Sequence, residues 1–445
     1  MFSPGRERLE CPVAGQHGYR GAVGDERRPS EIPFEDAAFP EDAVAAERQP
    51  RAPHPPTRER GTLSDRDVLA GIAAEVGLRR VHFVAWRDLD DPEAGGSELH
   101  AHHIASLWAD AGIDVTFRTS AAQGTEAALT RDGYRVLRKA GRYGVFPGAA
   151  WEGIRMGNRP GDALVEIWNG MPFFSPLWYR GPGLVFLHHV HAEMWGMVLP
   201  RRLARLGELV ERRVAPRVYR KSRIVTLSES SRREIIDILG LAPERITVSP
   251  PGVDARFSPG GERSAAPLVV AVGRLVPVKR FDLLVRSLAT LRERVPTLRA
   301  AIIGEGYARP QLEQLRTELG AESWLDLPGR VEDDQLVEWY RQAWVVASTS
   351  QREGWGMTLT EAAACGTPAV ATAIAGHTDA VLHGESGLLV ESPDDLTGAL
   401  ERILTDEVLR NRLGRGALSR ARWFTWGATA RRSLEALAEE TVRRR

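Results

Sequence analysis

Two successive series of alternating strand and helix patterns predict an α/β fold with two doubly wound parallel-sheet, Rossmann-like domains that face a central cleft. The first series begins after residue 62 and the second at residue 268, beyond a segment rich in proline, glycine and serine. Strands that alternate with helices form a parallel sheet with helices on its faces. A chain of 445 residues is also too long for one ordinary hydrophobic core, so length alone favours two domains.

Short apolar runs typical of buried strands divide the first series. The opening strand is predicted at 80–86, and a helix is predicted from Gly95-Gly96-Ser97-Glu98 to about Ala111. The later strands of this series are predicted at 113–117, 163–168, 184–188, 223–227 and 245–248. Together these elements predict an N-terminal domain over residues 63–253.

The second series follows a predicted linker at 254–267. Its strands are predicted at 268–272, 300–303, 324–327, 344–347, 369–371 and 387–390. They define a C-terminal domain over residues 268–424. Residues 425–445 have a helical pattern, and we expect this helix to cross back to the first domain.

Composition excludes several classes of function. Residues 1–62 are rich in proline and charge without periodicity, which predicts a disordered extension, or else a non-native or upstream start. The formal net charge is zero, so no nucleic-acid partner is expected. No apolar run approaches the ~20 residues that span a bilayer, and no secretory signal is recognisable. Only two cysteines occur, which favours a reducing, cytoplasmic location.

Segment 353–362 carries the most specific chemistry in the sequence. Glu353 and Glu361 lie on either side of a predicted helix start, and Gly354 and Gly356 flank the tryptophan between them. A helix start at the carboxyl edge of a parallel sheet offers unpaired N–H groups that suit a phosphate. Carboxylates accept hydrogen bonds from sugar and ribose hydroxyls. The segment therefore has the groups needed to bind a nucleotide sugar.

Five motifs in this order resemble the family 4 retaining glycosyltransferases of the GT-B fold. They are Gly95-Gly96-Ser97-Glu98, His188-His189-Val190-His191, Gly273-Arg274-Leu275 with Lys279-Arg280, Gly304-Glu305-Gly306, and 353–361 with the following Cys365-Gly366. Together they span about residues 78–425. The resemblance implies hexosyl transfer from a nucleotide-diphosphate sugar, of the GDP-mannose or UDP-sugar type, to an acceptor hydroxyl. It further implies a metal-independent, retaining enzyme without a cofactor, acting in the synthesis of a cell-envelope or exopolysaccharide glycan or glycolipid.

The resemblance places the donor on the second domain. Arg274 and Lys279 follow its first strand, where two fixed cations would stabilise the charge that grows on the departing diphosphate. Glu361 is expected to accept from the ribose hydroxyls, and Glu353 from the donor sugar. A glycosidase-like acid/base pair is the alternative for these two carboxylates, but a phosphate-binding helix start lies between them. Further donor contacts are expected from Gly95, Gly96, Gly273, Gly304, Gly306, Gly356 and the N–H groups of Met357 and Thr358. For Gly95 and Gly96 a tight turn for packing is the alternative.

His189 and His191 resemble the family's His-x-His at a strand end. The resemblance implies that His191 contacts the transferred sugar or the acceptor hydroxyl and that His189 belongs to the acceptor site. Packing is the alternative, and a metal site is disfavoured because neighbouring strand residues point to opposite faces.

Asp88-Leu89-Asp90 matches a metal motif of a different glycosyltransferase fold, but here it lies in a loop of an α/β domain. No metal is therefore predicted.

The sequence says less about the acceptor site than about the donor site. Loops at 120–162 and 169–183 are expected to shape the acceptor pocket. Residues 200–223 have the pattern of a basic amphipathic helix, which is either a solvated helix face or a contact with the inner face of an anionic membrane that holds a lipid-linked acceptor. Residues 375–379 depart from the family's Gly-Gly followed by Glu, so their role is open.

Other functions fit the same architecture. A nucleotide-sugar epimerase would need acid/base groups at the sugar ring, and a phosphorylase would need a cofactor lysine, but neither pattern is visible. A non-catalytic protein that binds sugar or nucleotide sugar would be expected to lack Arg274, Lys279 or Glu353, and all three are present. Glycosyl transfer is the leading hypothesis.

Overall fold

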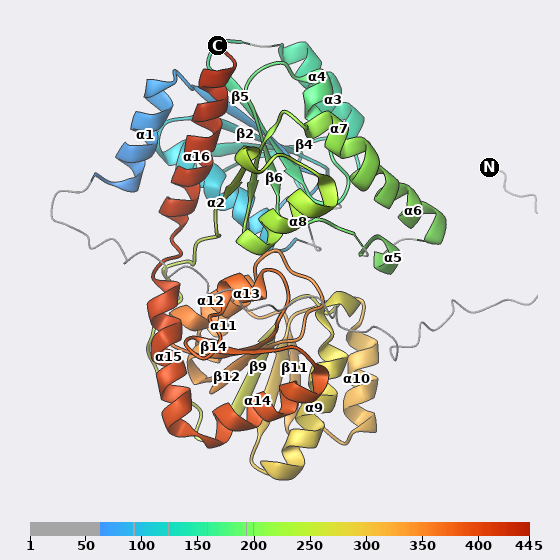
Figure 1. The fold of residues 1–445 in the computed structure, drawn as a ribbon, viewed down its shortest axis with the longest axis vertical. Coiled ribbons are helices and arrows are strands. Elements are labelled where there is room, and N and C mark those ends of the chain that lie inside the picture. The colour runs from blue at the N-terminus through green and yellow to red at the C-terminus, as the bar shows by residue number, and fades with distance from the viewer. Residues whose placement is uncertain (1–62, 92–93, 123, 158, 193, 199) are drawn as a thin grey trace, which may run out of the picture. The chain divides into compact units, whose positions relative to one another are not determined.

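The structure is a computed structural model that describes residues 63–91, 94–122, 124–157, 159–192, 194–198 and 200–445 (Figure 1). The predicted extension over residues 1–62 lies outside this described part. The described residues form two sheets, of eight and six strands, each accompanied by helices. The predicted fold class, with two doubly wound α/β domains, is confirmed.

The first sheet is almost entirely parallel. Its strands, in spatial order, are β3 (Ala128–Arg131), β4 (Tyr134–Arg138), β2 (Asp114–Thr119), β1 (Arg80–Val84), β5 (Asp162–Trp168), β6 (Gly183–Leu187), β7 (Arg223–Thr226) and β8 (Ile246–Val248). The helices of this half before residue 250 are α1 (Asp65–Glu75), α2 (Gly96–Asp110), α3 (Val145–Met156), α4 (Ser175–Trp178), α5 (Met194–Val198), α6 (Arg201–Leu209), α7 (Ala215–Tyr219) and α8 (Glu229–Leu239). A π-helical segment, η2 (Val210–Val214), joins α6 to α7.

The hairpin β3–β4 differs from the loop that we expected across residues 120–162. The two strands pair antiparallel, with Arg131 opposite Tyr134. Asp132 and Gly133, which connect them, both have positive φ angles, of 43° and 85°. This geometry belongs to the two-residue hairpin turn for which Asp-Gly is a strong sequence signal. The hairpin was therefore detectable, and it extends the sheet beside β2.

The second sheet is parallel throughout its described strands. Their spatial order is β11 (Leu325–Gly329), β10 (Arg299–Ile303), β9 (Leu268–Val272), β12 (Val345–Ser348), β13 (Ala369–Thr372) and β14 (Gly387–Val390). Its helices are α9 (Phe281–Arg294), α10 (Arg309–Glu318), α11 (Asp333–Gln342), α12 (Met357–Ala364), α13 (His377–Ala380), α14 (Pro393–Thr405) and α15 (Glu407–Ala421). β9 lies between β10 and β12, so the loops after β9 and β12 leave the same edge of the sheet, where ligands bind.

The last helix, α16 (Trp426–Arg443), completes the core of the first sheet (Figure 1). The Thr425 hydroxyl accepts a hydrogen bond from the Ala428 N–H at 3.2 Å and caps its first turn. Leu434 and Leu437 are fully buried in the same apolar cluster as Phe83 of β1. Among the described residues, no helix has the length and apolarity needed to cross a membrane.

Candidate active site

Lys279 and Glu353 form an ion pair at the carboxyl edge of the second sheet. Lys279 ends a short 3-10 turn that follows β9, and Glu353 lies in the loop between β12 and α12. The Ser350 hydroxyl donates a second hydrogen bond to Glu353 at 2.8 Å. Burial alone would raise the pKa of the Glu353 carboxyl, but the Lys279 ammonium outweighs burial and lowers it. The Glu353 carboxyl is therefore ionised at neutral pH.

The backbone around Lys279 is held by one buried threonine. The hydroxyl of Thr349 donates to the carbonyl oxygens of Lys279 and Arg280, at 3.0 and 2.9 Å. Arg280 has a φ of 48°, a left-handed conformation that non-glycine residues seldom adopt. A fixed loop in a sparsely populated conformation is typical of sites that position charged groups.

The start of α12 meets the glycine loop of the first sheet. A Cβ built on Gly96 would lie 3.1 Å from the sulfur of Met357, the first residue of α12. A Cβ on Gly95 would lie 3.6 Å from the Nε of Arg274. Residues predicted separately as donor contacts are thus neighbours. Their proposed contact with a donor stays a prediction.

Gly354 and Gly356 are required by close backbone approaches. A Cβ on Gly354 would lie 2.6 Å from the carbonyl oxygen of His188. Gly356 precedes α12 with a φ of 104°, and a Cβ there would lie 3.0 Å from the His377 ring. The first N–H groups of α12 have no intrahelical acceptor, which suits an anion.

Glu361 lies one turn into α12 and contacts α11. The Tyr340 hydroxyl donates to its Oε2 at 2.9 Å. Burial raises the pKa of Glu361 to about 7, against the opposing effect of that hydrogen bond. The carboxyl is therefore only partly ionised at neutral pH in the ligand-free protein.

The glycines after β9 and β10 pack against each other. A Cβ on Gly304 would lie 2.0 Å from the carbonyl oxygen of Gly273, and one on Gly306 would lie 2.3 Å from that of Leu275. The two loops approach so closely that any side chain at 304 or 306 would overlap the neighbouring backbone, which explains the glycines. Donor contact by Gly273, Gly304 and Gly306 remains a prediction.

The histidines after β6 occupy two environments. His189 and His191 stack with their ring centroids 5.1 Å apart, whereas His188 Nε2 lies 3.1 Å from His100 Nδ1 of α2. Burial lowers the pKa of His191 to about 4, so its imidazole is neutral at pH 7. The His191 Nδ1 has no hydrogen-bond partner within the described part of the chain. A neutral ring with an unused nitrogen suits a hydroxyl-bearing ligand.

Glu211, which the sequence analysis missed, holds the His191 loop. Its carboxylate accepts from the backbone N–H groups of His191 and Ala192, at 2.7 and 2.9 Å, and from the Trp195 indole N–H at 3.1 Å. Glu211 lies in the π-helical segment η2, and π-bulges are frequent at functional sites. The only sequence signal was an acidic residue in a strongly basic stretch.

Residues 375–379, whose role was open, contact the start of α8. Asp379 accepts from the Glu229 backbone N–H at 3.0 Å and from the Ser230 hydroxyl. The Gly376 N–H in turn donates to the Ser230 hydroxyl at 2.8 Å. These hydrogen bonds link the loop that departs from the family pattern to the first turn of α8, whose own N-cap is Ser228.

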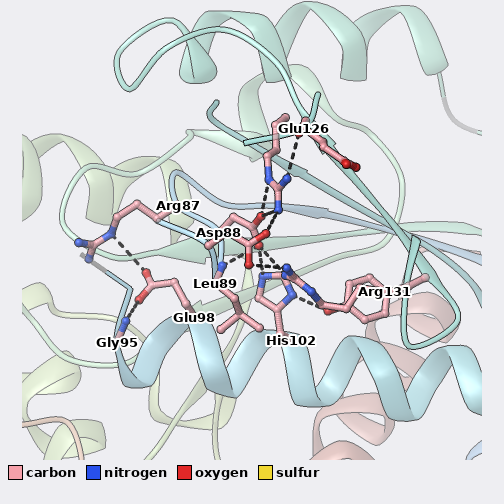
Figure 2. Close-up of polar contacts among 11 residues, drawn as sticks. Arg87, Asp88, Leu89, Gly95, Glu98, His102, Glu126 and Arg131 are labelled. Atoms are coloured by element: carbon pink, nitrogen blue, oxygen red, sulfur yellow. Dashed lines mark hydrogen bonds and ion pairs between the residues drawn. The ribbon is translucent and has the colours of Figure 1, made fainter. Parts of the chain in front are cut away.

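The carboxylates of Asp88 and Asp90 pair with arginines. Arg131 pairs with both, at 2.9 and 2.7 Å, and Arg138 contacts both as well. Figure 2 shows Asp88 with Arg131 and His102. The structure thus gives the Asp-x-Asp sequence guanidinium partners.

Comparisons with known proteins identify the family of this chain. A family model described as Glycosyltransferase Family 4 matches residues 94–257, and one described as Glycosyl transferases group 1 matches residues 254–420. The chain is 30% identical over 422 residues to the D-inositol 3-phosphate glycosyltransferase of Stackebrandtia nassauensis, which covers 83% of this chain and 93% of the relative. It is 32% identical over 438 residues to the protein of the same name from Acidothermus cellulolyticus, which covers 84% of this chain and 94% of the relative.

Solved structures show the same fold. Sucrose-phosphate synthase from Thermosynechococcus elongatus superposes with a TM-score of 0.67 at 18% identity, over 79% of this chain and 96% of that chain. The Anabaena HepE protein in complex with UDP-glucose superposes with a TM-score of 0.66 at 19% identity, over 81% of this chain and 99% of that chain. At these identities the likeness concerns the fold alone.

Proposed function

The chain belongs to the family 4 glycosyltransferases of the GT-B fold, and from this premise we propose that it transfers a hexosyl group from a nucleotide-diphosphate sugar to an acceptor hydroxyl. The observation that carries the proposal is the Lys279–Glu353 ion pair beside the start of α12. It places a cation for a phosphate and a carboxylate for sugar hydroxyls at one sheet edge.

In the proposed donor complex the ion pair opens to admit the diphosphate. Lys279 and Arg274 turn to the phosphate oxygens, and the first N–H groups of α12 bind the distal phosphate. Glu353 then accepts from hydroxyls of the sugar, and Glu361 from those of the ribose. HepE, a protein of the same fold, was solved with UDP-glucose, which supports a UDP-sugar as the first donor to test.

The proposed reaction retains the anomeric configuration and uses no metal. The acceptor oxygen bonds to the anomeric carbon on the face that the diphosphate leaves, and the carbon–oxygen bond to the diphosphate breaks. The acceptor proton passes to an oxygen of the departing phosphate. Glu353, released by Lys279 in the donor complex, is assigned to accepting hydrogen bonds from the sugar hydroxyls and not to nucleophilic attack. The growing negative charge is stabilised by the two cations.

The exposed face of α6 supports a membrane-bound acceptor. Leu203, Leu206 and Leu209 are each about half exposed, at 52%, 53% and 52%, while Ala204 and Gly207 face the protein. Arginines flank this stripe at 201, 202 and 205. An apolar stripe bordered by arginines is typical of a helix that lies in an anionic membrane surface. We therefore propose action at the cytoplasmic face of the membrane on a lipid-linked acceptor.

D-inositol 3-phosphate is the second candidate acceptor, because it appears in the names of relatives that match most of this chain. Vesicle binding at low salt separates the two candidates. Binding to anionic vesicles that Leu206→Glu abolishes supports the lipid-linked acceptor. Absence of vesicle binding, together with transfer to D-inositol 3-phosphate, supports the second.

The donor is tested with a thermal-shift panel of nucleotide sugars, because a ligand of the folded state raises its apparent stability. Each donor that binds is then assayed for transfer, with the product anomer assigned by NMR. We expect one donor class to bind, an α-linked product from an α-linked donor, and unchanged turnover in a metal chelator. Inversion or loss of turnover in the chelator would refute the corresponding part of the proposal.

A further inference from the structure

A buried charge network is linked to the glycine loop through Arg87 and Glu98 (Figure 2). Its centre is Asp88, which follows β1 and is only 3% exposed. Asp88 accepts hydrogen bonds from Arg138 Nε at 2.5 Å and from Arg131 Nη1 at 2.9 Å. His102 of α2 places its Nε2 3.2 Å from the same carboxylate. The network thus joins the loop after β1 to the β3–β4 hairpin and to α2.

The network is balanced in charge. Two carboxylates, Asp88 and Asp90, face two guanidinium groups, Arg131 and Arg138. Burial alone would raise the pKa of Asp88, but His102, Arg138 and Arg131 hold it well below its ordinary value. Burial lowers the pKa of His102 despite the adjacent carboxylate, and its Nδ1 lies 2.5 Å from the Tyr134 hydroxyl. Removing the charge of Asp88 alone leaves two guanidinium groups facing one carboxylate, that of Asp90. Buried charges tolerate such an imbalance poorly.

Arg87, the residue before Asp88, links the network to the glycine loop through Glu98. Arg87 and Glu98 are both buried, with Nε and Oε1 3.5 Å apart. The other oxygen of Glu98 accepts from the Gly95 N–H at 2.8 Å. Gly95 in turn lies against Arg274. A continuous series of contacts therefore runs from the hairpin arginines to the loop that faces the proposed diphosphate site.

We propose that Asp88, held by Arg131 and Arg138, is a positioning residue that keeps Gly95 and Gly96 at the distance from Arg274 and Met357 that donor binding requires. The inference rests on the proposed function for the identity of the ligand. It gives the Asp-x-Asp sequence a role in donor affinity through the backbone of the glycine loop. Acceptor recognition, by contrast, does not depend on the network.

The test compares the KM of the donor with the KM of the acceptor in variants of Asp88 and Arg131. In Arg131→Gln, which alters the more accessible arginine, and in Asp88→Asn we expect donor KM and the Kd of the nucleoside diphosphate to rise about tenfold, since small misplacements of binding groups are costly. Acceptor KM is expected to change by less than about twofold. Arg135→Gln is the matched control, because Arg135 lies on the same hairpin, half exposed and outside the network. Unchanged donor KM in folded network variants would overturn the proposal.

A double variant separates positioning from simple instability. Asp88→Asn with Arg131→Gln removes one charge of each sign, so we expect it to be more thermostable than Asp88→Asn alone while donor KM stays raised. Recovery of donor KM together with stability would show that the network acts only on folding, and would refute the proposal.

A further readout does not need the ligand. The Gly95 N–H donates a hydrogen bond to the Glu98 carboxylate. We expect hydrogen exchange at this N–H to accelerate in Asp88→Asn and Arg131→Gln but not in Arg135→Gln. If the wild-type protein binds no nucleotide sugar, the proposed function fails on its own. The exchange rate of this amide then decides whether Asp88 holds the glycine loop, and an unchanged rate counts against the inference.

Discussion

The two halves of the candidate site are built in different ways. On the second sheet, Glu353, Gly356 and Glu361 lie in one short segment whose shape depends on glycine backbone and a helix start. On the first sheet, loops are held by buried carboxylates whose partners are distant in the sequence. Asp88 and Arg138 are 50 residues apart, and Glu166 and Tyr219, which share a 2.6 Å hydrogen bond, are 53 apart.

The difference separates a segment shaped by local backbone geometry from loops held by long-range side-chain contacts. A segment of the first kind depends on its own glycines and its helix start. A loop of the second kind depends on one buried carboxylate and a distant partner. This comparison leads to four predictions, ordered by the size of the expected effect.

Lys279→Ala is expected to have the largest effect, because it removes a cation aimed at the charge of the transition state. Turnover should fall about 10²–10³-fold, the scale of losing one such group. Lys221→Ala, an exposed lysine of the other half, is the matched control and should leave turnover unchanged. Near wild-type turnover in Lys279→Ala would remove the catalytic assignment of this lysine, and the same measurement on Arg274→Ala tests its partner.

Glu211→Leu tests how far the acceptor side depends on one buried carboxylate. Two backbone N–H groups and one indole N–H lose their acceptor, and orphaned buried donors cost about 1–3 kcal/mol each. We expect a loss of stability of about 3 kcal/mol in urea unfolding. In the folded fraction, acceptor KM should rise while the donor Kd is unchanged. A raised donor Kd would show that Glu211 supports the donor side as well as the acceptor side.

The ionisation of Glu361 predicts a pH dependence of donor affinity. Ribose hydroxyls bind the ionised carboxylate, and its pKa is about 7 in the ligand-free protein. Donor Kd should therefore fall as pH rises from about 6 to 8, by at most about tenfold. Isothermal titration over this range measures the change, and a flat profile in wild type, or an equal slope in Glu361→Gln, would contradict the assignment.

Folding stability changes with pH in the opposite direction to donor affinity. The folded protein keeps a proton on Glu361 that the unfolded chain loses above its ordinary pKa of 4.5. The folded state therefore binds more protons between pH 4.5 and about 7, and this carboxyl makes stability fall as pH rises through that window. Glu361→Gln should remove that slope.

Asp379→Ala should have the smallest effect, because it removes an acceptor of hydrogen bonds from Glu229 and Ser230 while Ser228 still caps α8. The cost is about 1 kcal/mol, the net contribution of a typical hydrogen bond. Differential scanning calorimetry measures it, with Asp334→Ala, a substitution in the first turn of α11, as control. A much larger loss of stability would mean that this contact, which joins α8 to α13, is a principal link between the two halves.

The sequence predicted most of the fold because strand and helix patterns are local. Apolar runs at 268–272 and 387–390 became β9 and β14 with the same bounds. The β3–β4 hairpin was missed although Asp132-Gly133 signalled it, because short strands with exposed residues have little apolar pattern.

By itself the sequence determined the fold class and the family, and it predicted the chemistry of the 353–361 segment. Each depends on residues close together in the chain, where spacing sets which groups share a turn or a helix start. Only the tertiary structure decided that Lys279 pairs with Glu353, that Glu211 holds the His191 loop and that arginines surround Asp88. These contacts join distant segments, and which partners meet depends on how the sheets order their strands and loops.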